Sequence, residues 1–573
     1  MTAQYMTGQM YMALSYNVAA VKWYTKAAEQ NCPEAQCELG KCYETGDGVG
    51  KNEAKAIELY RKAAVQGYAE AQKKLGNCYS YGIGVAKDLE QAFECYSKAA
   101  KQGNVKAQYN LGVCYECGWG VTKDLAKAAE WYRKSAEQGH ARAQCNLGVC
   151  YEYGKGVTKD LAKAVEWYRK SAEQGDARAQ YNLGWCYEYG EGVTKDLAKA
   201  VEWYRKAAER GNAKAQFALG ECYYYGDGIE ENNEEAVKWY RKAAEKDVAN
   251  AQCMLGECYY YGYGVEENNE EAVKWFRKAA EQDVAKAQNL LGDCFYYGYG
   301  VKTNYWEAAK WYEKAANQGN VDAQNMFGYC YEYGKGITKD LSKAAEWYRK
   351  AAEQGYATAQ CNLGICYEYG RGVTKDLSKA AEWYRKSAEQ GYASAQFNLA
   401  RLYANGYGVA QNKEEAAKWY RKAAEQGMAS AQNSLGYCYD KGEGVEKNSA
   451  KAVEWYRKSA ENGNASAQYN LGLCYEYGTG VTLSRATAAE WYRKAAEQEY
   501  ADAQYKLGVF YENGYGVTQD KEQAMQWYKK AADQGNEKAK SAIDRMQSSG
   551  MGAAVAAGAA AATVGLLWKI LRG

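Results

Sequence analysis

The sequence predicts an all-α protein, an α/α superhelical solenoid built from 36-residue helix–turn–helix repeats. Three observations lead to this prediction: a fixed period of 36 residues, a near-absence of proline, and glycines placed regularly between apolar segments. The chain of 573 residues contains one proline, a residue that breaks helix interiors, and 59 glycines. Because one compact core rarely serves so long a chain, several domains or a repeat array are expected.

The dipeptide Ala-Gln marks the period. Its alanine recurs every 36 residues, at Ala35, Ala71, Ala107, Ala143, Ala179, Ala215, Ala251, Ala287, Ala323, Ala359, Ala395, Ala431, Ala467 and Ala503. An earlier copy at Ala3 lies 32 residues before Ala35, so the loop inside the first unit is expected to be four residues shorter. A last half-unit begins at Ala539. We therefore predict a solenoid over residues 1–546, made of fifteen units and a terminal helix.

The first half of each unit has the apolar spacing of a helix. In the unit that begins at Ala107 the apolar positions are Ala107, Leu111, Cys114 and Tyr115. Gly118 and Gly120 then follow, and glycine ends a helix readily because it tolerates positive φ. A first helix and a turn are predicted here.

The second half of the unit begins with a capping residue. Asp124 precedes the next periodic segment, and the equivalent position is Asp, Asn or Ser in all fourteen full-length units. These residue types accept the free amide groups at a helix start, so they predict N-caps. The buried face of the second helix is expected at Ala128, Trp131, Tyr132 and Ser135, and Gly139 closes it. Neither helix buries its apolar face alone, so neighbouring units must stack.

These residues carry a family resemblance. The pattern A-Q-x-x-L-G-x-x-Y-x-x-G-x-G-V, followed by A-x-x-W-Y-R-K-A-A-E-Q-G, resembles the Sel1-like repeat, a relative of the tetratricopeptide repeat. The resemblance covers nearly the whole chain and implies a right-handed superhelix that serves as an adaptor for other proteins. This sequence departs from the family pattern in the inter-helix loop, where the usual proline is replaced, as in the segment that ends at Asp124.

Composition and cysteine placement narrow the function. A net charge of +2 gives no global reason to expect nucleic acid as a partner. The cysteine count of 19 is odd and the opening residues lack a secretory pattern, which favours reduced thiols in the cytosol. Twelve cysteines share one position, which Leu402 and Phe510 fill in two other units, so it is interpreted as an apolar packing site.

Catalysis has no support in the sequence. His140 is the only histidine, stands between two units, and is interpreted as an exposed loop residue without a partner. No Cys/His spacing indicates a metal site, no glycine-rich loop indicates a phosphate site, and no nucleophile–base set is recognisable. We therefore predict no enzyme, no cofactor and no metal. A hydrolase activity, as in cysteine-rich bacterial relatives, is the remaining alternative from another class.

Comparison of the internal copies suggests where a partner binds. The sixth residue after the alanine varies from unit to unit and includes Trp185 and Tyr329. By analogy with tetratricopeptide arrays, this position would face a concave groove. Three consecutive units combine an acid there with tyrosines: Glu221 with Tyr224, Glu257 with Tyr260, and Asp293 with Tyr296. They predict an acidic, tyrosine-rich stripe that binds a basic or aromatic peptide. Packing of these tyrosines between helices is the alternative.

The composition changes after Arg545. Residues 547–552 are predicted to form a linker and residues 553–573 a C-terminal apolar helix that anchors the chain in a membrane. The anchor residues are Val555, Val564, Leu566, Leu567 and Trp568, followed by the basic residues Lys569 and Arg572. Many alanines make this segment only weakly apolar, so a disordered tail is the alternative.

Together these features predict a scaffold, adaptor or receptor that binds a protein or peptide in its groove. In this hypothesis the tail tethers the chain and the solenoid faces the cytosol. The basic C-terminus resembles anchors of mitochondrion-type outer membranes, which suggests an organelle outer membrane. The alternative is a soluble cytoplasmic scaffold.

Overall fold

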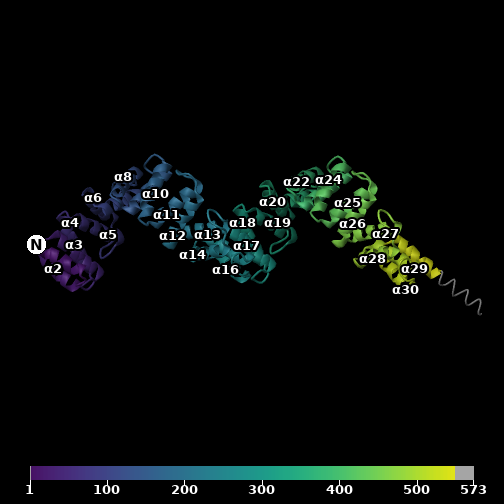
Figure 1. Cartoon of the computed structure of the whole chain (residues 1–573), viewed down its shortest axis with the longest axis horizontal. Helices are drawn as coiled ribbons and strands as arrows, with labels where there is room; N and C mark the ends of the chain where they lie inside the picture. Colours follow the sequence, from purple (N-terminus) through teal and green to yellow (C-terminus); the bar gives the residue numbers. More distant parts are fainter. Residues whose placement is uncertain (1, 549–573) are drawn as a thin grey trace, which may run out of the picture. The chain divides into compact units, whose positions relative to one another are not determined.

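The computed structural model describes residues 2–548, and within that range every regular element is a helix and no strand occurs. The chain divides into two compact units, Met1–Ala287 and Gln288–Gly573. In each unit the helices follow one another in chain order as pairs (Figure 1). The all-helical repeat fold predicted from the sequence is confirmed.

We call the first helix of each repeat its A helix and the second its B helix. The A helices are α1 (Thr2–Ala13), α3 (Pro33–Thr45), α5 (Ala69–Tyr81), α7 (Val105–Cys117), α9 (Ala141–Tyr153), α11 (Ala177–Tyr189), α13 (Ala213–Tyr225), α15 (Ala249–Tyr261), α17 (Ala285–Tyr297), α19 (Val321–Tyr333), α21 (Ala357–Tyr369), α23 (Ala393–Asn405), α25 (Ala429–Lys441), α27 (Ala465–Tyr477) and α29 (Ala501–Asn513).

The B helices are α2 (Asn17–Glu29), α4 (Glu53–Val65), α6 (Leu89–Lys101), α8 (Leu125–Glu137), α10 (Leu161–Glu173), α12 (Leu197–Glu209), α14 (Asn233–Ala244), α16 (Asn269–Glu281), α18 (Tyr305–Asn317), α20 (Leu341–Glu353), α22 (Leu377–Glu389), α24 (Lys413–Glu425), α26 (Ser449–Glu461), α28 (Arg485–Glu497) and α30 (Lys521–Asp533). The loop of the first repeat spans residues 14–16 and that of the second spans residues 46–52, so the expected shortening by four residues is confirmed.

Every predicted N-cap of a full-length B helix is formed. Asp124 accepts the Lys127 backbone N–H at 3.0 Å, and the equivalent Asp, Asn or Ser caps the B helix in each of the other thirteen repeats. One such cap stabilises a helix by about 1 kcal/mol. The fourteen caps therefore fix where each B helix begins.

Two glycines of each loop are required by geometry. Gly118 ends α7 in the left-handed region, with φ of 75°. Gly120 has φ of 69°, and a Cβ on it would lie 2.0 Å from the carbonyl oxygen of Leu89 at the start of α6. The loop of one repeat therefore lies directly against the B helix of the preceding repeat.

Inside each repeat, a glycine of the A helix touches a tyrosine ring of the B helix. A Cβ on Gly148 would lie 2.6 Å from the Tyr168 ring, so only glycine allows this approach. The ring is fully buried, and its hydroxyl donates a hydrogen bond to the carboxylate of Glu152. The same tyrosine–glutamate pair recurs in eight repeats, in which the glutamates are Glu44, Glu116, Glu152, Glu188, Glu332, Glu368, Glu476 and Glu512.

Buried glutamines join successive repeats. The Gln144 side-chain amide donates to the carbonyl oxygen of Ala136 in the preceding repeat at 3.0 Å, and its oxygen accepts from Gln174 at 2.7 Å. A second link runs between Arg133 and the hydroxyl of Tyr151 in the next repeat, at 3.1 Å. Each donor reaches its acceptor only when neighbouring repeats stack in one position. These polar contacts therefore fix how one repeat stacks on the next.

The cysteines are packing residues, as predicted. All nineteen thiols are free, and all except Cys117 are buried. Burial raises the pKa of the Cys114 thiol to about 12, which disfavours the reactive thiolate. Leu402 and Phe510, which stand at the same position of other repeats, are equally buried.

The solenoid ends in a helix over residues 537–548, two residues beyond the end expected from the repeat. The Ser548 hydroxyl donates to the carbonyl oxygen of Asp544 inside this helix. Within residues 2–548 no helix is both long and apolar enough to cross a membrane. The rest of the predicted linker and the whole predicted anchor lie outside the described residues.

The glycine–tyrosine contact generates a test. Gly148→Ala places a methyl group against the Tyr168 ring and should destabilise that repeat by about 1–3 kcal/mol. In an array, local stability is best followed by hydrogen exchange, so amides of α9 and α10 should exchange faster than in the unsubstituted protein. The matched control is Ala400→Gly, at the one full-length repeat that carries alanine in this place, with an expected cost of about 1 kcal/mol or less. Unchanged exchange in Gly148→Ala would contradict the steric argument.

Candidate functional site

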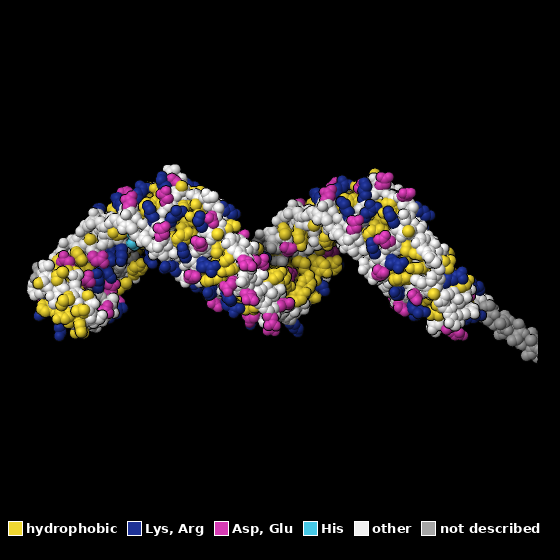
Figure 2. All heavy atoms as spheres, viewed as in Figure 1, with side chains coloured by type: hydrophobic (Ala, Val, Ile, Leu, Met, Phe, Trp, Pro, Cys, Tyr) yellow, Lys and Arg dark blue, Asp and Glu magenta, His cyan; other side chains and the backbone are white. Residues whose placement is uncertain are grey.

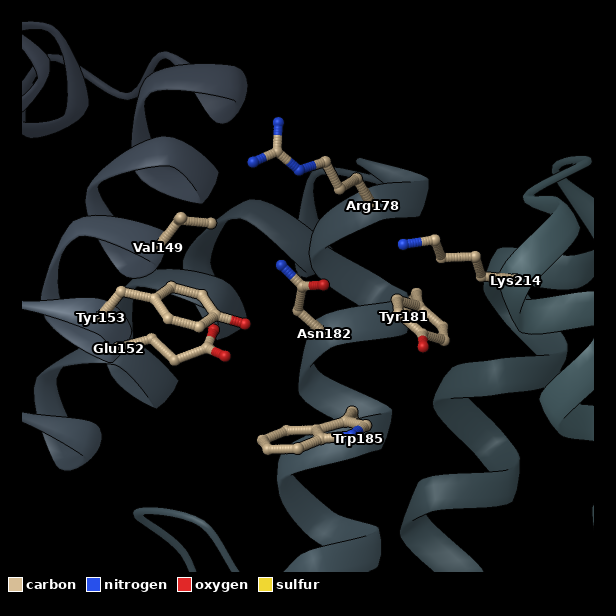
Figure 3. Close-up of a pocket in the computed structure, with 8 residues that line it drawn as sticks. All are labelled: Val149, Glu152, Tyr153, Arg178, Tyr181, Asn182, Trp185 and Lys214. Carbon is tan, nitrogen blue, oxygen red and sulfur yellow. The ribbon is translucent and has the colours of Figure 1, made fainter. Parts of the chain in front are cut away.

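The A helices carry a hollow on the side where the sequence varies between repeats. A cavity of about 250 Å³ is lined by Val149, Glu152 and Tyr153 of α9, Arg178, Tyr181, Asn182 and Trp185 of α11, and Lys214 of α13. All eight residues belong to three consecutive A helices, and none comes from a B helix (Figure 3). We call this the Trp185 cavity.

Aromatic and polar groups share the walls of the Trp185 cavity. The Trp185 indole is half-buried and lies 5.1 Å from the ring of Tyr189, while Tyr153 is 64% exposed. Figure 3 shows the Asn182 amide directed into the space between Tyr153 and Tyr181, with Trp185 on one side and Arg178 on the other. Such a mixture of aromatic surface and unpaired polar groups suits recognition of a peptide more than burial in a core.

An equivalent hollow exists in the second unit. It also measures about 250 Å³, and its lining includes Tyr437, Asp440 and Lys441 of α25 with Leu473 and Tyr477 of α27. Tyr437 and Leu473 stand at the same variable position as Val149 and Trp185. Tyr456 of the B helix α26 and Thr479 of the following loop also line this second hollow. A hollow between neighbouring A helices therefore occurs in both units, and the residues that vary contribute to its chemistry.

The three carboxylates of the predicted stripe have different surroundings. Glu257 is 9% exposed and forms an ion pair with Lys286, with 2.7 Å between Oε1 and Nζ. Asp293 accepts a hydrogen bond from the Tyr312 hydroxyl at 2.7 Å, and burial raises the pKa of this carboxyl to about 6. Both are more strongly engaged inside the protein than expected for residues that face a groove.

Glu221 is the unsatisfied member of the three. It is half-buried and forms no ion pair or hydrogen bond within the described part of the chain. Burial raises the pKa of its carboxyl to about 7, with further contributions from the negative charges of Glu188 and Asp227. The nearby hydroxyl of Tyr240 is buried and also lacks a hydrogen-bond partner. This repeat therefore holds polar groups that no part of the described chain satisfies.

The tyrosines of these repeats form edge-on pairs at the surface. Tyr224 packs against Tyr225 with ring centroids 4.9 Å apart, and Tyr225 is 61% exposed. In the second unit Tyr296 contacts Tyr329 at 6.2 Å, and Tyr329 lies 4.4 Å from Tyr333. Figure 2 shows hydrophobic side chains gathered over α19. Tyr260 is half-buried and pairs in the same way with the exposed Tyr261, at 4.8 Å.

Comparison with known proteins identifies the repeat. A model of the Sel1 repeat matches fifteen consecutive segments, residues 2–32, 33–68, 69–104, 105–140, 141–176, 177–212, 213–248, 249–284, 285–320, 321–356, 357–392, 393–428, 429–464, 465–500 and 501–536. The chain belongs to the Sel1 repeat family. The resemblance and the fifteen units predicted from the sequence are thus confirmed.

Two solved structures are similar to this Sel1 array. One is a protective antigen present in uropathogenic Escherichia coli strains, which displays an SLR fold; it is 36% identical, covers 86% of this chain and 97% of its own, and has a TM-score of 0.67. The other is a Sel1 repeat protein from Oxalobacter formigenes, 34% identical over 54% of this chain and 89% of its own, with a TM-score of 0.44. No curated protein matches. A Sel1-repeat scaffold is consistent with a role in protein–protein interaction.

One regularity of the Sel1 array escaped the sequence analysis. In most repeats the buried B-helix tyrosine meets a glutamate such as Glu188, near the end of the A helix. Where a tyrosine such as Tyr296 stands at that place, an acid stands three residues earlier, and in this repeat Asp293 accepts the hydroxyl instead. Of the three acids of the predicted stripe, Asp293 alone compensates in this way, since the Tyr240 hydroxyl has no partner among the described residues and Phe276 has no hydroxyl. The signal was visible as a correlation between two positions of the internal copies.

His140 differs from its interpretation as an exposed loop residue. It is half-buried at the N-cap of α9, where Nδ1 accepts the Ala143 backbone N–H at 3.2 Å. Its ring lies 4.9 Å from that of Tyr109. Burial lowers the pKa of the imidazole, and the positive charges of Lys106 and Arg142 lower it further. Asn104, Asp176 and Asn212 cap the neighbouring A helices in the same way. Within residues 2–548 no group of three or more His, Cys, Asp or Glu could hold a metal ion.

The raised pKa of Glu221 generates a pH prediction. Since its pKa in the folded protein, about 7, exceeds its usual 4.5, folding favours the protonated form and stability is lost as pH rises through this interval. Glu221→Gln should therefore raise the melting temperature at pH 8 by about 2–4 °C and have little effect at pH 4.5. Scanning calorimetry at both pH values measures this difference. Glu230→Gln, in the exposed loop that follows α13, serves as the matched control, and an equal gain there would refute the assignment to Glu221.

Proposed function

We propose that this Sel1 array is a protein-binding scaffold that takes an extended segment of a partner along its A helices. The Trp185 cavity carries this proposal, because Val149, Arg178 and Trp185, which line it, stand at positions that change from repeat to repeat. The positions that stay constant, such as Ala179, Leu183 and Gly184, are buried and serve packing. Residues that vary at an accessible, aromatic-lined hollow are what a specific binding surface requires.

The partner chemistry expected from the sequence has support at one of the three acids. Burial and the negative charge of Glu188 disfavour the ionised form of the Glu221 carboxyl. A lysine or arginine side chain of the partner, placed beside both glutamates, would stabilise that ionised form. Glu257 and Asp293 already have partners, so they contribute less to such recognition. Trp185 and Tyr329, with Tyr224, Tyr260 and Tyr296, offer aromatic contact area at low entropy cost. We therefore retain a basic or aromatic segment as the partner class at these repeats.

The tail completes the proposal. We infer that residues 553–573 tether the scaffold to a membrane. The uncharged run of residues 551–568 ends in Trp568 and is followed by Lys569 and Arg572, which matches the length and boundary residues of a short membrane segment. The solenoid would then face the cytosol from an organelle outer membrane. An untethered scaffold is the alternative reading.

Site-specific crosslinking tests the groove. Tyr153 is replaced by the photoreactive p-benzoyl-phenylalanine, which is nearly isosteric, in the full-length protein in its own cells. Irradiation should give defined adducts with partner proteins, since Tyr153 lines the cavity and is well exposed. The matched control places the same residue at Trp119, which is 42% exposed in the loop between α7 and α8. The same adducts from both positions, or none from Tyr153, would speak against binding in the cavity. Trp185→Ala should reduce the Tyr153 adducts.

Carbonate extraction tests the tail. A reporter fused ahead of residues 546–573 should remain in the membrane pellet after alkaline wash. The double substitution Val564→Arg and Leu566→Arg should return it to the supernatant, because each central charge costs about 2.5–3.5 kcal/mol on insertion. A wild-type reporter that is fully extracted would refute the anchor and leave the scaffold proposal intact.

A further inference from the structure

A row of basic residues stands at the start of four consecutive A helices. Lys106, Arg142, Arg178 and Lys214 are the second residues of α7, α9, α11 and α13, and all four are exposed. We call them the cation row. At the same position α3, α5, α19 and α29 carry an acid, and α21, α23, α25 and α27 carry serine or threonine. Asn250 follows the row in α15, and Lys286 stands at this position in α17. Four consecutive basic residues at this position therefore occur in one segment of the first unit.

The cation row does not serve helix stability. A helix N-terminus carries a partial positive charge, so a basic residue in the first turn is electrostatically unfavourable there. An acid is favoured instead, as Glu34 and Glu70 illustrate in the first turns of α3 and α5. Four successive helices carry a charge of the unfavourable sign in their first turn, so the cation row needs an explanation other than folding.

The cation row is also unpaired. None of its four members forms an ion pair with any described residue, although other basic residues of A helices do. Lys74 pairs with Glu44 at 2.9 Å, Lys286 with Glu257 at 2.7 Å, and Lys506 with Glu476 at 2.9 Å. The positive charges of Lys106 and Arg142 help to lower the pKa of the nearby His140 imidazole. These charges are thus available to a ligand.

The cation row borders a hollow surface. Arg142 and Arg178 line a second cavity of about 510 Å³, together with Arg210, Asn146, Asn212 and Asp176. The Asp176 carboxylate accepts backbone amides at the start of α11. Arg178 also lines the Trp185 cavity, so the two hollows adjoin at this residue. The Asn182 amide points into the Trp185 cavity and makes no hydrogen bond among the described residues, which leaves it free for the backbone of a bound chain (Figure 3).

The opposite edge of this surface is acidic. Glu116, Glu152 and Glu188 accept tyrosine hydroxyls but have no basic partner in the next repeat. In other repeats the equivalent Glu44, Glu368 and Glu476 are neutralised by Lys74, Arg401 and Lys506. A uniformly negative strand such as single-stranded nucleic acid would meet this acidic edge as well as the cation row. A polypeptide can present acidic side chains to one edge only.

We propose that the surface of α7, α9, α11 and α13 binds an extended segment of a partner protein whose acidic side chains pair with Lys106, Arg142, Arg178 and Lys214, beside an aromatic residue seated against Trp185. This inference rests on the proposed function. It specifies in addition that the partner is acidic where it contacts the N-terminal ends of the A helices. Helices in contact lie about 8–10 Å apart, which is roughly three residues of extended chain. The partner segment therefore carries an acidic residue at about every third position.

The test uses the full-length protein and two labelled peptides. The first consists of repeated Glu-Tyr-Ser units and the second of repeated Lys-Tyr-Ser units, and fluorescence anisotropy measures their binding. The Glu-Tyr-Ser peptide should bind more tightly, and its affinity should fall as salt shortens the Debye length from ~10 Å at 0.1 M to ~3 Å at 1 M. Arg178→Glu with Lys214→Glu should weaken it by roughly tenfold or more. This variant should fold, because it places acids in first helical turns.

Matched controls separate local recognition from global charge. Lys159→Glu with Lys195→Glu makes the same change in net charge in two exposed loops, one in the repeat of Arg178 and one in the repeat before it, and should weaken binding by less than about twofold. Equal losses in both variants, no loss in either, no binding of the Glu-Tyr-Ser peptide, or tighter binding of an oligouridylate would overturn the proposal. If Trp185→Ala weakens peptide binding but charge reversal at Arg178 and Lys214 does not, binding at the Trp185 cavity is supported and the acidic partner is refuted. If charge reversal weakens binding and Trp185→Ala does not, the cation row is upheld without the cavity.

Discussion

The contact between a glycine of each A helix and a buried tyrosine ring of its B helix is the constraint on which the rest of the repeat depends. Because the Tyr132 ring occupies the space where a side chain on Gly112 would lie, the two helices approach more closely than larger residues would allow. The ring then directs its hydroxyl to Glu116 near the end of the A helix. The repeat that carries Ala400 shows the effect of losing this arrangement, since its Tyr420 is 8% exposed and has no glutamate to meet.

Stacking between repeats uses groups that leave one side of the A helices free. Buried glutamines such as Gln144 reach the preceding repeat through the backbone, and Gly120 brings each loop against the preceding B helix. The B helices carry lysines over tryptophan rings, as with Lys134, whose Nζ lies 4.2 Å from the centroid of the Trp131 ring. Figure 2 also shows acidic side chains gathered over α14 and α16, whose first turns carry Glu234, Glu235, Glu270 and Glu271. On the remaining A-helix surface only some repeats form contacts with their neighbour, such as the ion pair of Glu257 with Lys286, so its residues can differ between repeats.

The sequence predicted the fold in detail because the deciding interactions are local. The caps at Asn52, Asp124 and Ser484 depend on backbone groups two or three residues away, and all were foreseen from residue type. The site was less predictable. The ion pair of Glu257 with Lys286 joins residues 29 positions apart. The repeat period alone does not predict that these two side chains meet. His140 was misinterpreted because a histidine cap is rarer than the asparagine and aspartate caps beside it.

The distribution of sulfur has a separate chemical consequence. Eighteen of the nineteen thiols are enclosed, and the exposed one, Cys117, ends α7 at the position where α9 and α11 present Tyr153 and Tyr189. Toward electrophiles and oxidants in solution, the folded protein therefore behaves as if it held a single cysteine. Alkylation or glutathionylation at that sulfur would attach a group to the same face of the array that carries the Trp185 cavity, while the enclosed sulfurs would react only after a repeat has opened.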